Sequence, residues 1–234
     1  MTAPRLSVII PVYNEVRTIR RIVDLVAAVP IDKEIVIVDD GSSDGTAAIL
    51  RERYAGRPGF NVLTHPRNAG KGAAVRTGIA AARGEALIVQ DADLEYDPKD
   101  YAVLVEAMER TRANAVYGSR FLRESRRSVP FWHRSVNFFL TALTNLLFGS
   151  RLTDMETCYK MLRRATWQGL NLRSTGFEVE VEITAKLLLA GERIVEVPVA
   201  YERRSYREGK KIGWKDGLAA VAWLLRHRLR GRRR

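Results

Sequence analysis

The sequence has little of what several classes of protein depend on. It contains one cysteine, Cys158, among 234 residues, which excludes an internal disulfide. Its most apolar stretch, residues 135–150, is interrupted by asparagine and threonine, so we expect no transmembrane helix. His65 and His133 lack the spacing of zinc ligands, and we interpret them as solvated or capping residues.

Two phosphate-binding motifs are missing as well. No GxGxxG follows the first apolar run, and GxxxxGK[ST] occurs nowhere in the chain. These absences disfavour a dinucleotide cofactor and a Walker-type NTPase. The glycine-rich segment Gly70–Lys71–Gly72 opens a predicted helix. It either faces a phosphate or is a plain helix N-terminus.

Positive charge, in contrast, is abundant. Lysine and arginine outnumber aspartate and glutamate by 39 to 27, which gives a formal net charge of +12. Such an excess indicates an anionic partner, which is a nucleic acid, an anionic membrane surface or a phosphorylated substrate. The arginines gather in a mid-chain set and in a tail, namely Arg120, Arg123, Arg126, Arg127 and Arg134, and Arg226, Arg228, Arg230 and Arg232–Arg234.

Strand and helix patterns alternate over the first ninety residues. Short apolar runs predict strands at 6–12, 34–38, 61–64 and 86–89, with helical spacing between them. This alternation predicts an α/β fold with a parallel sheet and helices on both faces. The second half is predicted to contain helices at 100–111, 178–190 and 214–229, strands at 115–117 and 194–201, an irregular segment at 152–163 and a basic loop at 203–211.

Polar clusters follow three of the predicted strands. They are Tyr13–Asn14–Glu15, Asp39–Asp40–Gly41–Ser42 and Asp91–Ala92–Asp93. The carboxyl ends of parallel strands meet at one crevice, so we expect these clusters to lie together. Glu15 and Asp40 would accept hydrogen bonds from a base and a ribose, and a cation on the last cluster would bridge a diphosphate. The alternative is an acidic turn that caps the next helix through Asp97–Pro98.

Eight short motifs occur in a fixed order along the chain. They are SVIIPVYNE, VDDGSSDGT, RNAGKGAAVRTGI, QDADLEYDP, VYGSRF, TDMETCYKMLRR, FEVEVEITAKL and EGKKIGWKDG. Together they resemble the inverting family-2 glycosyltransferases of GT-A fold, from Leu6 to about Leu225. The last three are similar to the branch that contains dolichol-phosphate mannose synthase and bacterial polyprenyl-phosphate glycosyltransferases.

The resemblance implies a fold and a reaction. The fold is a Rossmann-like mixed sheet with helices on both faces, followed by amphipathic interface helices. A single domain over residues 1–225 would hold a nucleotide-sugar half up to about residue 120 and an acceptor half after it, with a basic tail at 226–234. The implied reaction is metal-dependent, inverting transfer of a hexose from GDP-mannose or a UDP-hexose to a polyprenyl or dolichyl phosphate, with Mg²⁺ or Mn²⁺ as cofactor.

The resemblance also assigns residues. The positions that match donor-binding residues are Pro11, Tyr13, Glu15, Val38, Asp40, Asp91, Ala92, Arg204 and either Lys210 or Lys211. Asp91 and Asp93 match the DxD motif that binds the metal, with Glu95 as a third contact. Arg120 and Arg134 match arginines that hold the acceptor phosphate.

The chemistry of the acceptor leaves alternatives open. A phosphate monoester has a second pKa of about 6, so it would attack without a general base and would need arginines to offset its charge. A saccharide or protein hydroxyl would need a base, for which Asp154 and Glu156 are the candidates unless they are structural. A nucleic-acid-binding module is the third hypothesis. The acidic crevice disfavours it, because carboxylates repel a phosphate backbone.

Residues 129–149 carry more apolar side chains than one buried stripe of a helix holds. They predict either ordinary core or a pair of helices in the headgroup region of a membrane. The arginine tail suits an anionic lipid surface, at about 1 kcal/mol for each basic residue near it. We therefore expect a peripheral protein at the cytoplasmic face of a membrane, with a homo-oligomer or a membrane-protein partner left open.

Overall fold

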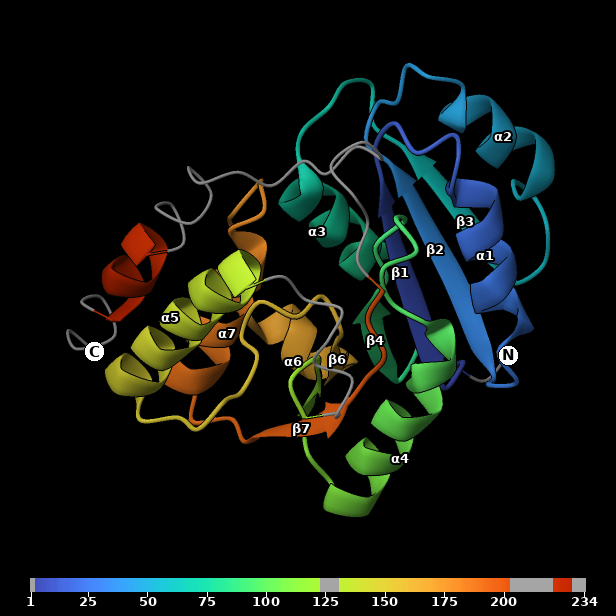
Figure 1. Ribbon diagram of the computed structural model, residues 1–234. Coiled ribbons are helices and arrows are strands. Elements are labelled where there is room, and N and C mark those ends of the chain that lie inside the picture. Colours follow the sequence, from blue (N-terminus) through green and yellow to red (C-terminus); the bar gives the residue numbers. More distant parts are fainter. Residues whose placement is uncertain (1–2, 123–130, 203–220, 229–234) are drawn as a thin grey trace.

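The computed structural model describes residues 3–122, 131–202 and 221–228 (Figure 1). These residues form a seven-stranded sheet with the order β3-β2-β1-β4-β6-β5-β7. The strands are β1 (Leu6–Val12), β2 (Lys33–Asp39), β3 (Phe60–Thr64), β4 (Ala86–Val89), β5 (Ala115–Ser119), β6 (Lys160–Arg163) and β7 (Ile194–Pro198).

The first four strands form the parallel part of the sheet. β1 pairs in parallel with both β2 and β4, and β3 extends the sheet beyond β2. β1 and β4 are buried almost throughout, which explains why their sequences are continuous apolar runs rather than alternating ones. The parallel sheet predicted for the first ninety residues is confirmed.

The remaining strands make the sheet mixed. β6 lies between β4 and β5 and is antiparallel to both, whereas β5 and β7 are parallel. The prediction of irregular structure over 152–163 is therefore wrong for its last four residues. β4 is also four residues long but wholly apolar, whereas β6 has only two apolar residues between Lys160 and Arg163, so no apolar run identifies it as a strand. The helix α6 (Arg164–Gly169), which follows directly, was not predicted either.

Helices cover the sheet. Besides α6 they are α1 (Ile19–Ala28), α2 (Thr46–Arg53), α3 (Lys71–Ala81), the short 3₁₀ helix η1 (Pro98–Asp100), α4 (Tyr101–Thr111), α5 (Phe131–Phe148) and α7 (Val179–Leu189). α3 contacts β1 and β2, α6 contacts β4 and β6, and α4 contacts β5 and β7. The close approach of α3 depends on Gly78, because a Cβ there would collide with the side chain of Ile9 on β1.

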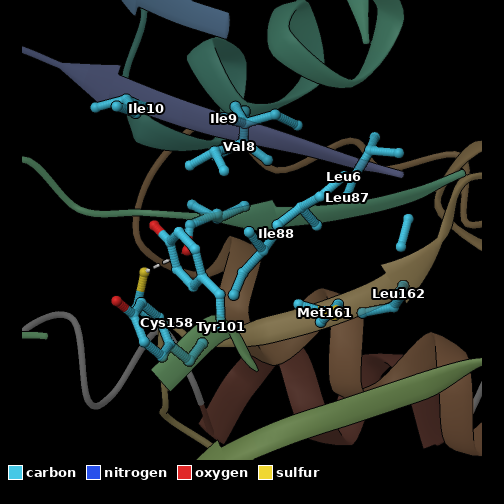
Figure 2. Packing of buried hydrophobic residues seen from close by; sticks show 14 of the residues in the cluster. Leu6, Val8, Ile9, Ile10, Leu87, Ile88, Tyr101, Cys158, Met161 and Leu162 are labelled. Carbon is cyan, nitrogen blue, oxygen red and sulfur yellow. Dashed lines mark hydrogen bonds between the residues drawn. The ribbon is translucent and has the colours of Figure 1, made fainter. Parts of the chain in front are cut away.

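The main core fills the space around β1, β4 and β6. Figure 2 shows Val8, Ile88 and Met161 meeting there, all inaccessible to solvent. Cys158 lies at the same place with a free thiol, and its Sγ is 3.6 Å from the carbonyl oxygen of Val89 (Figure 2). Cys158 therefore serves as a small buried residue.

A second, smaller core joins α5, α7 and a helical segment at 221–228. Figure 1 shows these three helices together on one side of the molecule, away from α1 and α2. Its buried members are Leu140, Leu152, Met155, Val181, Ala185 and Leu224. The helix pair predicted within 129–149 is instead the continuous helix α5. No helix among the described residues is both long and apolar enough to span a bilayer.

Candidate active site

The loops after β1 and β2 are tied together at the carboxyl edge of the sheet. The amide of Asn14 donates to Ser42 Oγ at 2.9 Å, and the side-chain oxygen of Asn14 accepts from the amide of Ser43 at 2.8 Å. The amide of Glu15 donates to Thr46 Oγ1 at 3.0 Å. The expected meeting of these two strand ends is thus confirmed by contacts between the loops.

The residues expected to bind a nucleoside lie along these two strand ends. Pro11 and Val38 are opposite each other in the β1–β2 register, and Val38 is buried. Tyr13 is partly exposed just beyond β1. Glu15 is 8% exposed, and its Oε2 accepts a hydrogen bond from Thr18 Oγ1 at 2.9 Å. These residues therefore border one common region at the edge of the sheet.

Asp40 has a structural task in the same region. Its carboxylate accepts hydrogen bonds from the amides of Ala69 and Gly70, at 3.0 and 2.8 Å, and its Oδ1 is 2.6 Å from His65 Nδ1. The other ring nitrogen of His65 is 2.9 Å from Thr77 Oγ1, so His65 links β3 to α3 as a hydrogen-bonded residue. Asp40 thus anchors the loop that leads into α3, and a nucleoside would use only its remaining acceptor capacity.

Lys71 connects that loop to the carboxylates after β4. Its Nζ is 2.7 Å from Asp91 Oδ1 and 3.1 Å from Glu180 Oε1 on α7. Burial acts to lower the pKa of Lys71, but Asp91 and Glu180 outweigh it and raise the pKa well above its usual range. The glycine-rich segment is a helix N-terminus whose first amide donors are already used, since Gly72 N–H donates to the carbonyl of Thr175 at 2.7 Å.

The carboxylates of the DxD segment repel one another. Burial first, and then the nearby Asp91 and Glu95, raise the pKa of Asp93 to about 7. Glu95 accepts a hydrogen bond from the hydroxyl of Tyr201 at 2.6 Å. Within the described residues, no three His, Cys, Asp or Glu side chains are grouped as a metal site, and Glu95 as a third metal contact stays a prediction.

The DxD residues nevertheless fit a divalent cation. A cation between Asp91 and Asp93 would relieve the repulsion that raises the pKa of Asp93. Mg²⁺ is commonly held by one or two carboxylates together with substrate phosphates, rather than by a cage made only of protein ligands. Two carboxylates at the carboxyl end of β4 match that pattern, and Ala92 between them is buried.

Arg120, which directly follows β5, is held in place by Asp154. Its Nε and Nη2 each lie 2.7 Å from a different oxygen of the Asp154 carboxylate, which is inaccessible to solvent. Asn137 on α5 donates to the same carboxylate at 3.1 Å. With these donors around it, Asp154 positions Arg120, and the structural interpretation of Asp154 is favoured over that of a base. The guanidinium carbon also lies 5.2 Å from the centre of the Tyr201 ring, so Tyr201 connects Arg120 to Glu95.

Glu156 differs from Asp154, although it is only two residues away. Its Oε1 is buried and has no hydrogen-bond partner in the described part of the chain. Burial is the main reason that its pKa is raised to about 7, and the nearby Glu180 adds to the rise while Lys160 opposes it. Glu156 can therefore hold or release a proton near neutral pH.

Comparison with known proteins decides the family. Residues 7–169 match the family described as "Glycosyl transferase family 2". The chain is a family-2 glycosyltransferase. It is 32% identical to the undecaprenyl-phosphate mannosyltransferase of Micrococcus luteus, over 93% of this chain and 91% of that protein. It is 29% identical to the polyprenol monophosphomannose synthase of Mycolicibacterium smegmatis, over 96% and 89% of the two chains.

Solved structures identify the fold of this glycosyltransferase as GT-A. The chain superposes on glucosyl-3-phosphoglycerate synthase from Mycobacterium tuberculosis, in complex with Mn²⁺, uridine diphosphate and phosphoglyceric acid, with a TM-score of 0.71. The match covers 96% of this chain and 78% of the other, at 20% sequence identity. The α/β fold expected from the sequence is therefore confirmed.

The side chains of four expected site residues lie outside the part of the chain that the structure describes. Arg204, Lys210 and Lys211 lie outside the described residues. Arg134 lies in α5, one turn before Asn137, and its side chain is also outside the described part.

Conversely, sequence reasoning missed four residues of the glycosyltransferase site, which are Lys71 as a partner of Asp91, and Lys160, Glu180 and Tyr201. Only Lys71 carried a signal in the sequence, because it stands between two glycines at the start of a helix. The other three reach the site from the second half of the chain, through contacts that no local pattern encodes.

Proposed function

We propose that this glycosyltransferase moves a hexose from a nucleoside diphosphate sugar to a polyprenyl phosphate at a membrane surface, with inversion and with a divalent cation. The observation that carries the proposal is the buried Arg120–Asp154 pair, which holds a guanidinium beside the DxD region through Tyr201. The two mannosyltransferase relatives, whose names specify polyprenyl phosphates, support the same class of acceptor.

On the donor side, the chain supplies a polar edge for a nucleoside and carboxylates for a diphosphate. Pro11, Tyr13, Glu15 and Val38 border the region in which the base and ribose would lie, and Asp40 holds the adjoining loop. Asp91 and Asp93 would hold Mg²⁺ or Mn²⁺, which neutralises charge on the departing diphosphate when it is bound. Arg204 and either Lys210 or Lys211 would add positive charge on the same diphosphate.

On the acceptor side, the chain has to bring a phosphate toward a site that already holds an anionic diphosphate. Arg120 offers a fixed guanidinium, since Asp154 engages one edge of it in two parallel hydrogen bonds. Arg134 is proposed as the second cation from α5. The phosphate oxygen then attacks the anomeric carbon from the side opposite the leaving diphosphate, and the bond to the diphosphate breaks as the new bond forms. A phosphate needs no base for this step.

A membrane face is supported by the outer surface of α5. Phe138 and Leu146 are 74% and 82% exposed, and Phe139 lies exposed beside them. The helical segment 221–228 packs on α5 through Leu224 and leaves Arg226 exposed. Exposed apolar side chains on α5 and an exposed arginine on the helix packed against it suit the boundary of an anionic membrane, where the polyprenyl phosphate is anchored.

The second candidate is transfer to a saccharide or protein hydroxyl. The unpartnered Oε1 of Glu156 and its pKa of about 7 favour it, because a base needs those properties. The pairing of Asp154 with Arg120 favours a structural role for Asp154 over that of a base. Glu156 is therefore the base to be tested if the acceptor is a hydroxyl.

One experiment separates the two candidates. The protein is incubated with Mn²⁺ or Mg²⁺, labelled GDP- and UDP-sugars, and undecaprenyl or dolichyl phosphate, and label is counted in the organic phase. We expect lipid-linked product, and a loss of about 100-fold or more in Asp93→Asn. Asp32→Asn, an exposed aspartate at the opposite edge of the sheet, is the control and should keep full activity. Label found only on added soluble sugars would contradict the lipid-phosphate acceptor and support a hydroxyl acceptor.

A further inference from the structure

Lys71 forms an ion pair with Asp91, one of the two carboxylates that the divalent cation would need as ligands. Its Nζ contacts both oxygens of Asp91, Oδ1 at 2.7 Å and Oδ2 at 3.0 Å. The side chain of Lys71 is only 12% exposed and that of Asp91 25%. The pair is thus largely shielded from water, and screening weakens it less than it weakens a surface ion pair.

The glycines on either side of Lys71 fix its position. Gly70 has a φ of +94°, and a Cβ at this residue would collide with the carbonyl oxygen of Thr175. A Cβ at Gly72 would lie 2.6 Å from the carbonyl oxygen of Ser174. These close approaches press the segment before α7 onto the start of α3, so Lys71 is placed between Asp91 and α7 by the backbone itself.

A second carboxylate keeps Lys71 in place from the other side. Glu180 on α7 is 3.1 Å from Lys71 through Oε1 and 2.6 Å from Lys160 through Oε2. Lys160 is buried in β6 and also donates to the carbonyl of Thr157. Two lysines and two carboxylates therefore alternate in a row, and each buried charge has an opposite neighbour.

We propose that Lys71 is the internal counter-ion of the DxD segment, which holds Asp91 in the free protein and yields it to the divalent cation that arrives with the donor diphosphate. Glu180 retains Lys71 when Asp91 is released, so the ammonium group stays beside the diphosphate. This role rests on the proposed use of a nucleotide-sugar with a metal. It predicts that the free protein binds a metal ion weakly and binds the metal–nucleotide complex far better.

The test measures Mn²⁺ binding directly, by electron paramagnetic resonance of free Mn²⁺, without any acceptor. Lys71→Met should bind Mn²⁺ alone about tenfold more tightly than the native chain, because the competing cation is gone. Lys71→Arg, which keeps the charge, should bind as weakly as the native chain. Addition of UDP or GDP should tighten Mn²⁺ binding strongly in the native chain and much less in Lys71→Met.

Lys186→Met is the matched control, since Lys186 also pairs with a buried carboxylate, Glu182, at 2.7 Å but lies on α7 away from Asp91. It should leave Mn²⁺ binding unchanged. Equal or weaker Mn²⁺ affinity in folded Lys71→Met would overturn the role of Lys71. If that variant does not fold, Lys71→Gln carries the same expectation. Absence of Mn²⁺ binding even with UDP or GDP in the native chain would instead overturn the proposed metal-dependent function.

Discussion

Two helices of this glycosyltransferase, α1 and α5, differ in the kinds of side chain that they bury and expose. α1 buries Ile19, Ile22, Val23 and Val26 against the sheet and leaves its arginines toward solvent. α5 buries polar residues, with Asn137 7% and Thr144 0% exposed, and turns phenylalanine and leucine outward. The first pattern is that of an ordinary surface helix. The second pattern differs from it, because α5 buries asparagine and threonine beside Leu140 and exposes several of its apolar side chains.

The polar inner face of α5 has a definite task. Asn137 donates to Asp154, Thr141 Oγ1 accepts from the amide of Met155 at 3.2 Å, and Asn145 Oδ1 accepts from the amide of Leu152 at 2.9 Å. These contacts hold the loop 150–156, which in turn fixes Arg120. α1 therefore stabilises the fold through apolar burial, whereas α5 also holds the loop that carries Asp154 and leaves several apolar side chains exposed, as the proposed membrane contact requires.

The largest expected effect concerns the buried ion pair on this loop. Asp154→Ala should lower the free energy of unfolding by about 3–5 kcal/mol, because Arg120 would stay buried without its partner. Glu109→Ala removes a comparable pair with Arg5, whose side chains are 47% and 54% exposed, and should cost less than about 1 kcal/mol. Urea unfolding of both variants measures the difference, and equal losses would contradict the structural role of Asp154.

The next largest effect is expected at Arg134, which is proposed to bind the acceptor phosphate and not the donor. Arg134→Ala should raise the KM for the lipid phosphate by about tenfold, the loss of one charged contact, and leave hydrolysis of the donor sugar nearly unchanged. Arg110→Ala, an exposed arginine on α4, is the control. Parallel assays of lipid-linked product and of released nucleotide give both numbers. Equal loss of the two activities would remove Arg134 from the acceptor site.

A third prediction tests whether the exposed apolar side chains of α5, unlike that of Leu25 on α1, contribute to membrane binding. The double variant Phe138→Ser and Leu146→Ser should weaken binding to vesicles that contain phosphatidylglycerol by about tenfold or more, because two apolar side chains leave the interface. Its unfolding midpoint should stay unchanged, since both residues are exposed. Leu25→Ser on α1, which removes an apolar side chain that is 38% exposed, should leave vesicle binding intact. Similar losses from both helices would remove the membrane role of α5.

The smallest effect is a pH dependence at Glu156, which is surrounded by Arg120, Asp154, Lys160 and Glu180. Because the pKa of Glu156 is about 7, the carboxyl is neutral below that pH and negative above it. A phosphate acceptor should therefore react a few-fold more slowly as the pH rises through 7, and Glu156→Gln should remove this decline while keeping activity. A rise of activity with pH, abolished by Glu156→Gln, would instead identify Glu156 as a base for a hydroxyl acceptor.

Much of the fold of the first ninety residues follows from local sequence. The apolar runs of β1, β2 and β4 are continuous because both faces of each strand are buried, and their polar residues necessarily emerge at the same edge. The family was identified separately, through the resemblance of eight motifs in a fixed order. Local patterns missed β6, which makes the sheet mixed, because only two of its four residues are apolar and they lie between Lys160 and Arg163.

The sequence by itself determined the parallel sheet, the clustering of carboxylates at its edge and the excess of apolar residues in α5. Only the tertiary structure decided what those carboxylates face. Asp40 binds a loop, Asp91 binds Lys71, and Asp154 binds Arg120, whereas Glu156 alone among the residues of the loop 150–156 retains a buried oxygen without a partner in the described part of the chain. Each partner lies at least twenty residues away along the chain, and the pairing of buried charges depends on distances that folding sets.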